Sequence, residues 1–283
     1  MAIEFSPVVA AHEKRIGDAF SARSVDLGAL GDATSPVIVL DHFRIDAPVF
    51  GPHPHAGFSA VSYVLEDSPG ALRSRDTLGN DIVMGPGGIV WSQAGKGMMH
   101  EEVPAKTGRE LRGFQIFVNV RSRNKFVVPR VLSLDAGEVP EWRSGGGDRV
   151  RVAVGSFEGV ASPLVPVEPF TLLDAEVRRE IPLSLPPSHP ALVYVLSGLA
   201  RVRAGRADTD LGPGQALGIS GTGGRAMLEC VRTAHVLVLS GAEIREPVVA
   251  NGPFIMNDPS QIDAAFARYR AGEMGRLAPL SGS

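Results

Sequence analysis

Two short stretches of this chain hold the side chains best suited to binding a metal ion. His53 and His55 are separated by a single proline, and His100 and Glu102 are separated by a single residue. In an extended strand, residues i and i+2 point to the same face, so each pair would project together. If the two strands lie side by side, three imidazoles and one carboxylate meet at one point.

This donor set has a definite chemical preference. Imidazole and carboxylate ligands without sulfur suit Fe(II), Mn(II), Ni(II), Cu(II) or Zn(II). An octahedral site with these protein ligands keeps positions open for a substrate oxygen and for dioxygen or water. A closed structural zinc site is less natural, because neither pair has the spacing of a zinc finger. The spacing alone does not exclude the alternative that His53 and His55 lie close together by chance in a polar loop.

The elements that position these residues are expected to be short strands. The 283 residues are 44% hydrophobic and 21% charged, and they include 33 glycines and 22 prolines, a richness that favours strands joined by turns. One cysteine excludes an internal disulfide and a thiolate metal cluster. A net charge of −3 provides no basic surface for direct contact with nucleic acid or an anionic membrane. Without a long apolar segment, a cytoplasmic protein is expected.

The chain contains an internal repeat. The stretch around Tyr63 (SYVL) recurs around Tyr194 (VYVL), and MGPGG at 84–88 recurs as LGPGQ at 211–215. In Gly-Pro-Gly, proline and the glycine after it suit the two central positions of a type II turn between strands. The repeat predicts an all-β protein with two similar domains, residues 1–140 and 141–283, with the glycines at 145–147 as their connection.

One helix is predicted near the C-terminus, at about residues 259–271. Asp258 is suited to cap it, Pro259 occupies its first position, and Gln261 resembles the partner in a capping box. Its apolar positions are spaced so that one face packs against a barrel, and they are Ile262, Ala265, Phe266 and Tyr269.

Several longer stretches resemble the pirin family of the cupin superfamily. They are GPHPHAGFSAVSYVLE, SRDTLGN, MGPGGIVWSQAGKGMMHEEVP and FQIFVNV, and the resemblance extends from about residue 20 to about residue 275. It implies a bicupin, that is, two jelly-roll-like β-barrels. It also implies one mononuclear metal in the N-terminal barrel, commonly iron, with Mn, Ni, Cu or Zn as alternatives. The family's three histidines and one glutamate fall on His53, His55, His100 and Glu102.

The second half lacks a matching set of ligands. Ser184 and Pro186 stand where the first histidine pair would lie, and neither His189 nor His235 has a partner two residues away. The second barrel is therefore expected to be structural.

This chain departs from the family pattern at two positions near the predicted ligands. Ala56 stands where pirins usually have arginine, and Ser74 stands where they usually have histidine. Ala56 removes a charge near the site, so the substrate preference of relatives does not transfer directly.

The resemblance implies two functions of different classes. The first is a metal-dependent dioxygenase of the quercetin 2,3-dioxygenase type, which acts on a flavonol-like substrate with Glu102 as a catalytic base that accepts the substrate's hydroxyl proton. The second is a non-enzymatic, redox-sensitive regulator that binds a transcription factor or a metabolic enzyme. In either case we expect a monomer.

Overall fold

The computed structural model describes residues 3–280, which form β-strands, short 3-10 turns and one α-helix. The chain divides into two compact units. One consists of residues 13–23, 39–138 and 244–280, and the other of residues 3–12, 24–38 and 139–243. The predicted all-β class is confirmed. None of the helices in the described residues is long and apolar enough to cross a membrane.

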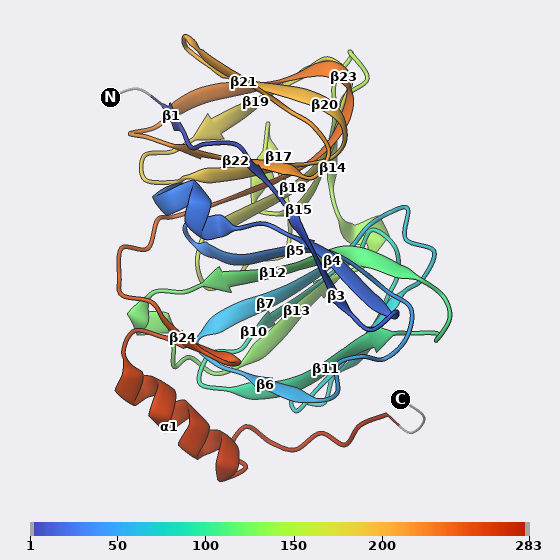
Figure 1. Cartoon of the computed structure of the whole chain (residues 1–283), viewed down its shortest axis with the longest axis vertical. Coiled ribbons are helices and arrows are strands. Elements are labelled where there is room, and N and C mark those ends of the chain that lie inside the picture. The colour runs from blue at the N-terminus through green and yellow to red at the C-terminus, as the bar shows by residue number, and fades with distance from the viewer. Residues whose placement is uncertain (1–2, 281–283) are drawn as a thin grey trace. The chain divides into compact units, whose positions relative to one another are not determined.

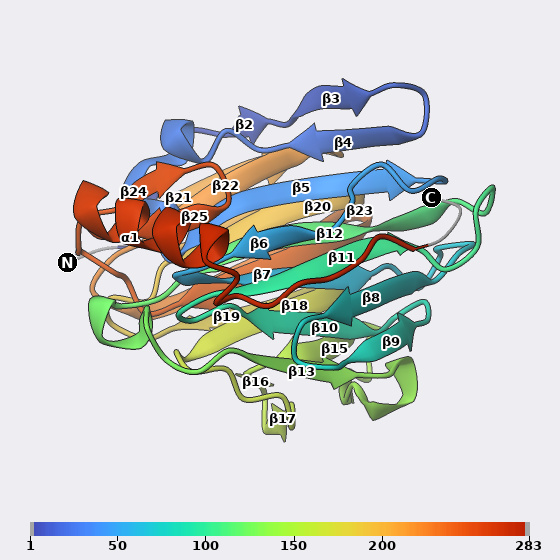
Figure 2. The same ribbon diagram turned by 90° about the horizontal axis from the view of Figure 1, so that it is seen from below.

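The unit that contains the predicted ligands is built from two main sheets. A seven-stranded sheet has the order β13-β10-β7-β12-β5-β4-β3, and a four-stranded sheet has the order β6-β11-β8-β9 (Figures 1 and 2). The elements of this unit are β3 (His12–Ile16), β4 (Phe20–Ser24), β5 (Val37–Ile45), β6 (His53–His55), β7 (Phe58–Val64), β8 (Leu72–Asp76), β9 (Asp81–Met84), β10 (Ile89–Gln93), β11 (Met98–Pro104), β12 (Leu111–Asn119), η2 (Ser122–Asn124), β13 (Arg130–Leu134), η3 (Ala136–Glu138), β24 (Val249–Asn251), β25 (Phe254–Met256) and α1 (Pro259–Arg270).

The other unit is built around one ten-stranded sheet, whose longest strands, β20 and β23, pair with each other. Its core consists of alternate residues of these strands and their neighbours, as expected where one face of each strand is buried. Its elements are β1 (Glu4–Phe5), β2 (Val9–Ala10), η1 (Leu27–Thr34), β14 (Glu141–Arg143), β15 (Arg149–Val154), β16 (Ser156–Phe157), β17 (Val160–Ala161), β18 (Phe170–Val177), β19 (Glu180–Leu185), β20 (Ala191–Ala204), β21 (Ala207–Leu211), β22 (Gln215–Ser220) and β23 (Gly224–Gly241).

The predicted domain limits need correction at both ends of the chain. β1 and β2 pair with β22, so the N-terminal stretch belongs to the unit formed by the second half (Figure 1). The C-terminal stretch instead belongs to the unit formed by the first half, where α1 buries Ile262 and Ala265 against Ala56 and Met99. Each of these two placements has a physical cause. The N-terminal strands make backbone hydrogen bonds to the edge of β22, and the apolar face of α1 is buried against the unit formed by the first half.

The glycines at 145–147 do not connect the two units. They form the turn of the β14–β15 hairpin, closed by hydrogen bonds between Ser144 and Asp148. The predicted connection was wrong because a glycine-rich turn and a glycine-rich linker have the same composition.

Other local predictions are confirmed. Gly87 and Gly214 have φ values of 84° and 77°, the left-handed conformation that the repeated Gly-Pro-Gly turns require. α1 begins at Pro259, with the Asp258 side chain accepting a hydrogen bond from the backbone N–H of Gln261. Tyr269 is an exception: it was predicted on the buried face of the helix, but it lies in the last turn and is 37% exposed.

Candidate metal centre

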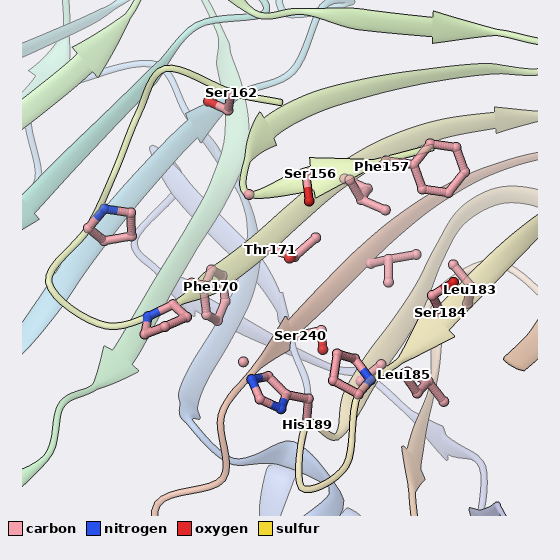
Figure 3. Close-up of a pocket in the computed structure, with 18 of the residues that line it drawn as sticks. Ser156, Phe157, Ser162, Phe170, Thr171, Leu183, Ser184, Leu185, His189 and Ser240 are labelled. Carbon is pink, nitrogen blue, oxygen red and sulfur yellow. The ribbon is translucent and has the colours of Figure 1, made fainter. Parts of the chain in front are cut away.

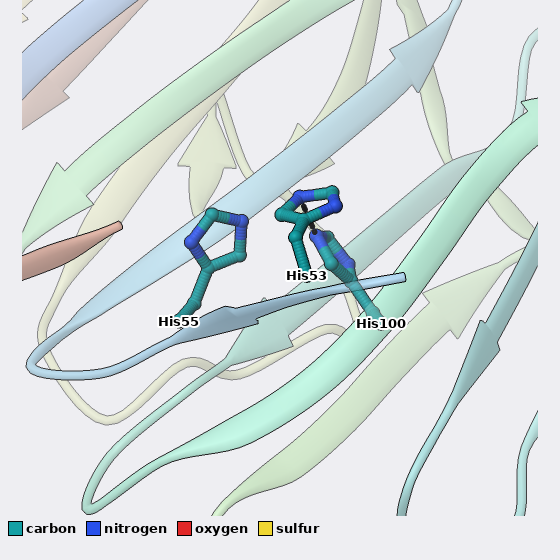
Figure 4. Close-up of side chains that lie close together, drawn as sticks. All are labelled: His53, His55 and His100. Carbon is teal, nitrogen blue, oxygen red and sulfur yellow. Dashed lines mark hydrogen bonds between the residues drawn. The ribbon is translucent and has the colours of Figure 1, made fainter. Parts of the chain in front are cut away.

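The pairing of β6 with β11 brings the predicted histidines together. The two strands are antiparallel, with His100 directly opposite His53 and Met98 opposite His55. Because side chains alternate along a strand, all three imidazoles project to the same face of the sheet (Figure 4). One ligand nitrogen from each ring lies within 4.8 Å of those of the other two. The geometry therefore makes a three-histidine cluster suited to a metal ion.

Backbone carbonyls determine which ring nitrogens are available for binding. Nδ1 of His53 donates a hydrogen bond to the Gly51 carbonyl at 2.9 Å, and Nδ1 of His55 donates to the Pro253 carbonyl at 3.4 Å. A carbonyl can only accept, so Nε2 of each ring carries the free lone pair. Metal-binding histidines are commonly oriented by this kind of hydrogen bond.

The spacing between two of these nitrogens matches that of neighbouring ligands on one ion. Nε2 of His100 lies 3.1 Å from Nε2 of His53. Two nitrogens about 2.1 Å from a metal and at right angles to each other are separated by about 3.0 Å. The residues present therefore fit a single mononuclear ion.

Burial keeps the three imidazoles neutral, which is the form that binds metals. Desolvation lowers the pKa of His53, and it lowers the pKa of His55 to about 3 with a further contribution from neighbouring His53. The pKa of His100 lies well below its ordinary value, because the ring is fully buried and the other two rings are close.

Glu102 lies beside the cluster, but hydrogen bonds to two serines hold its carboxylate. Ser62 Oγ donates to Oε2 at 2.5 Å and Ser74 Oγ donates to Oε1 at 3.2 Å, while Oε1 is 4.0 Å from Nδ1 of His100. Burial raises the pKa of Glu102, and the two serine hydrogen bonds oppose that rise. Ligation by Glu102 remains a prediction.

The cluster opens into a cavity of about 450 Å³ between the two sheets of this unit. Gln115 lines it and donates a hydrogen bond to the Val61 carbonyl at 3.2 Å. Apolar side chains form most of the remaining wall, and they are Phe20, Phe43, Ile45, Val49, Phe50 and Phe117. The cavity is therefore suited to an aromatic ligand with a polar group near the histidines.

Two residues important for this geometry were not predicted. Ser62 is a polar residue in the buried strand β7, an irregularity that could have pointed to the site. Lys125 is fully buried, and its Nζ donates to the carbonyls of Gly57 and Ile255 and to Oδ1 of Asn119, at 2.8 to 3.1 Å. Lys125 thereby ties the turn that follows His55 to β25.

Acidification is expected to destabilise the metal-free protein. The pKa of His55 is about 3 in the folded protein against 6.5 for an unperturbed ring, and the pKa values of His53 and His100 shift in the same direction. Below pH 6.5 the unfolded chain therefore binds more protons than the folded chain. The free energy of unfolding then falls with falling pH, by up to about 1.4 kcal/mol per pH unit for each fully buried ring.

Urea unfolding of the metal-free protein at a series of pH values from about 7 to about 4 measures this slope. The matched variant carries His53→Gln, His55→Gln and His100→Gln, and its slope should be shallower. Equal slopes for the two proteins would show that these rings do not titrate as described.

Comparisons with known proteins identify relatives of this chain and agree with its fold. The family model described as "Pirin" matches residues 13–118, and the one described as "Pirin C-terminal cupin domain" matches residues 172–275. A Pseudomonas aeruginosa protein named "Putative quercetin 2,3-dioxygenase PA3240" is 34% identical over 249 residues, which cover 84% of this chain and 86% of that protein.

Solved structures share the fold. A crystal structure of quercetin 2,3-dioxygenase from Acinetobacter baumannii has a TM-score of 0.86 at 24% identity, covering 98% of this chain and all of that one. A bacterial pirin from Escherichia coli in complex with nickel(II) has a TM-score of 0.65 at 18% identity, covering 86% of this chain and all of that one. The predicted cupin-type fold is confirmed by these likenesses.

Proposed function

This chain belongs to the pirin family, and we propose that it is a metal-dependent dioxygenase of the quercetin 2,3-dioxygenase type acting on a flavonol-like substrate. His53, His55, His100 and Glu102 hold one divalent ion per chain in this proposal. The observation that carries it is the cluster of three neutral imidazoles at the inner end of an apolar cavity. The cavity volume falls within the range of about 300–1,000 Å³ typical of small-molecule sites.

Iron(II) is the proposed ion. Nitrogen and oxygen donors without sulfur suit it, although they also accept Mn, Ni, Cu and Zn. When bound, the ion would supply a position for a substrate oxygen and would polarise it as a Lewis acid, while the substrate itself would be the reductant of dioxygen. The bacterial pirin from Escherichia coli that shares this fold was solved in complex with nickel(II), one of the metals that such donors accept.

The side chains of the cavity have distinct roles in this proposal. Phe20, Phe50 and Phe117 contact the aromatic rings of the substrate and exclude water. Glu102 accepts the proton of the substrate hydroxyl, for which its raised pKa makes it a better base than an exposed carboxylate. Ser62 and Ser74 orient its two oxygens.

Glu102→Gln is expected to lower flavonol-dependent oxygen uptake by about 10²–10⁴-fold, the usual contribution of a general base. Glutamine keeps the size of the side chain and can still pair with the serines, but it cannot accept the proton. Oxygen uptake with a panel of flavonols, measured beside metal content, tests this. Glu273→Gln, at an exposed glutamate of the same unit, is the matched control.

The possible outcomes separate the parts of the proposal. Full activity in metal-replete Glu102→Gln would exclude the base role alone. A fully metallated wild-type protein without turnover on any flavonol would contradict the dioxygenase. That result would favour the alternative of a redox-sensitive regulator, tested by metal-dependent capture of a transcription factor or metabolic enzyme.

A further inference from the structure

The unit formed by the second half contains its own cavity, of about 720 Å³, which is larger than the cavity at the histidine cluster (Figure 3). The change in side-chain size along the sheet explains it. Thr171, Ser240 and Ala191 lie next to one another on β18, β23 and β20 and line the cavity. The next layer inward is filled by larger buried side chains, Leu173, Val238 and Val193. The small side chains at the open end therefore leave a cavity, whereas the larger side chains of the next layer fill the space between the strands.

Polar groups that can bind a ligand face this space. The Thr171 hydroxyl has no hydrogen-bond partner among residues 3–280, so it is available as a donor. Nδ1 of His189 donates to the Pro187 carbonyl at 2.9 Å, which leaves Nε2 as an acceptor. Ser240 Oγ donates to the Pro190 carbonyl at 2.9 Å and keeps its lone pairs. Figure 3 shows Thr171, Ser240 and His189 in succession along the cavity.

The charges around the cavity disfavour an ionic ligand. None of the residues that line it, all within the described part of the chain, is a lysine or an arginine. Its one carboxylate, that of Glu158, is exposed and lies 3.5 Å from the guanidinium of Arg225. A charged ligand group would lose its hydration without gaining an opposite charge, whereas a neutral hydroxyl would gain hydrogen bonds.

The rim of the cavity is constrained before any ligand arrives. Within residues 3–280, only two non-glycine residues have a left-handed backbone, Glu158 with φ of 43° and Ser188 with φ of 57°. Glu158 lines the cavity, and Ser188 precedes His189, which also lines it. The first lies in the two-residue turn between β16 and β17, whose central positions take positive φ, and the second fixes the backbone directly before His189. Prolines restrict the walls further, at Pro166, Pro169, Pro182 and Pro186, so that little conformational entropy is lost on binding.

From these observations we propose that the second unit is a binding module for an uncharged, mainly apolar small molecule that carries a hydroxyl group. The hydroxyl accepts a hydrogen bond from Thr171, and Ser240 and Nε2 of His189 provide further acceptors along the cavity. The apolar body lies against Leu173, Leu183 and Val238. This cavity shares no lining residue with the one at the histidine cluster, and in this proposal the second half binds a ligand besides the structural role expected from its sequence.

Three matched probes test the chemistry of the ligand, using the full chain with its metal. They are 4-phenylphenol, biphenyl without the hydroxyl, and biphenyl-4-carboxylate with a negative charge. Methyl NMR signals of Leu173, Leu183 and Val238 report binding at this cavity separately from any binding at the histidine cluster. We expect saturable shifts with 4-phenylphenol and an affinity about three- to tenfold lower for biphenyl, the effect of losing a hydrogen bond. The carboxylate should bind more weakly than either. No shift of these methyls, or tightest binding by the carboxylate, would overturn the proposal.

Variants test the assigned contacts. Thr171→Val removes only the hydroxyl and should weaken 4-phenylphenol binding about three- to tenfold. Thr209→Val on β21, a strand that contributes nothing to this cavity, should bind like the wild type. Ser240→Leu should block the cavity, and the His53→Ala/His55→Ala protein should bind normally. Unchanged affinity in folded Thr171→Val, or loss of the methyl shifts in the His53→Ala/His55→Ala protein, would refute the assignment.

Discussion

The His53→Ala/His55→Ala protein is expected to lose its metal. Wild-type protein purified anaerobically should contain about one ion per chain, because three imidazole nitrogens converge within 4.8 Å. Removing two of the three should lower metal affinity by more than about 100-fold, since loss of a supporting partner outside the ligand set can already cost that much. Elemental analysis of the two proteins side by side is the measurement.

Unfolding experiments provide a second readout for the same substitution. An ion that binds only the folded state raises the free energy of unfolding by about 2.7 kcal/mol when its free concentration is 100 times Kd. Adding metal should therefore raise the melting temperature of the wild type and leave that of the double variant unchanged. The control is His12→Ala/His189→Ala, which removes two histidines outside the cluster. Metal retained in His53→Ala/His55→Ala would place the ion elsewhere, and a wild type without metal would refute the site.

The second large effect is expected from Arg75→Ala on β8, which removes the partner of Glu101 on the neighbouring strand β11. Glu101 lies between His100 and Glu102 on β11, so it points away from the cluster, and its side chain is fully buried in an ion pair with Arg75. Arg75 also donates to the Ala278 carbonyl at 2.9 Å. Removing the arginine leaves a buried carboxylate without its cation, which typically costs about 3–5 kcal/mol. Urea unfolding of the metal-loaded protein measures this loss.

Two further variants distinguish a buried ion pair from a general effect of charge. Arg73→Ala, two residues earlier on β8, breaks an ion pair with Asp81 that is exposed to solvent, so it should change the free energy of unfolding far less. Arg75→Leu/Glu101→Met replaces both partners with apolar side chains and should recover most of the lost stability. Similar losses in Arg73→Ala and Arg75→Ala, without recovery in the double variant, would contradict this account.

The sequence by itself determined the features that depend on residues close together in the chain. Alternation along a strand placed His53 with His55 and His100 with Glu102, and the structure shows these pairs facing one cavity. The Gly-Pro-Gly turns and the cap of α1 follow equally local rules of backbone conformation. The convergence of three histidines was predictable only on the condition that the strands of the two pairs lie side by side, and the pairing of β6 with β11 meets that condition.

Only the tertiary structure decided which distant segments meet. Lys125 donates to Ile255, 130 residues away, and no spacing rule relates the two. Ser62 reaches Glu102 across 40 residues, so the chain alone did not show that serines hold this carboxylate. The exchange of the terminal segments and the open end of the second unit have the same origin. Sheet edges, apolar faces and cavities are completed by whichever segment the whole fold brings to them, and local rules of spacing do not extend that far.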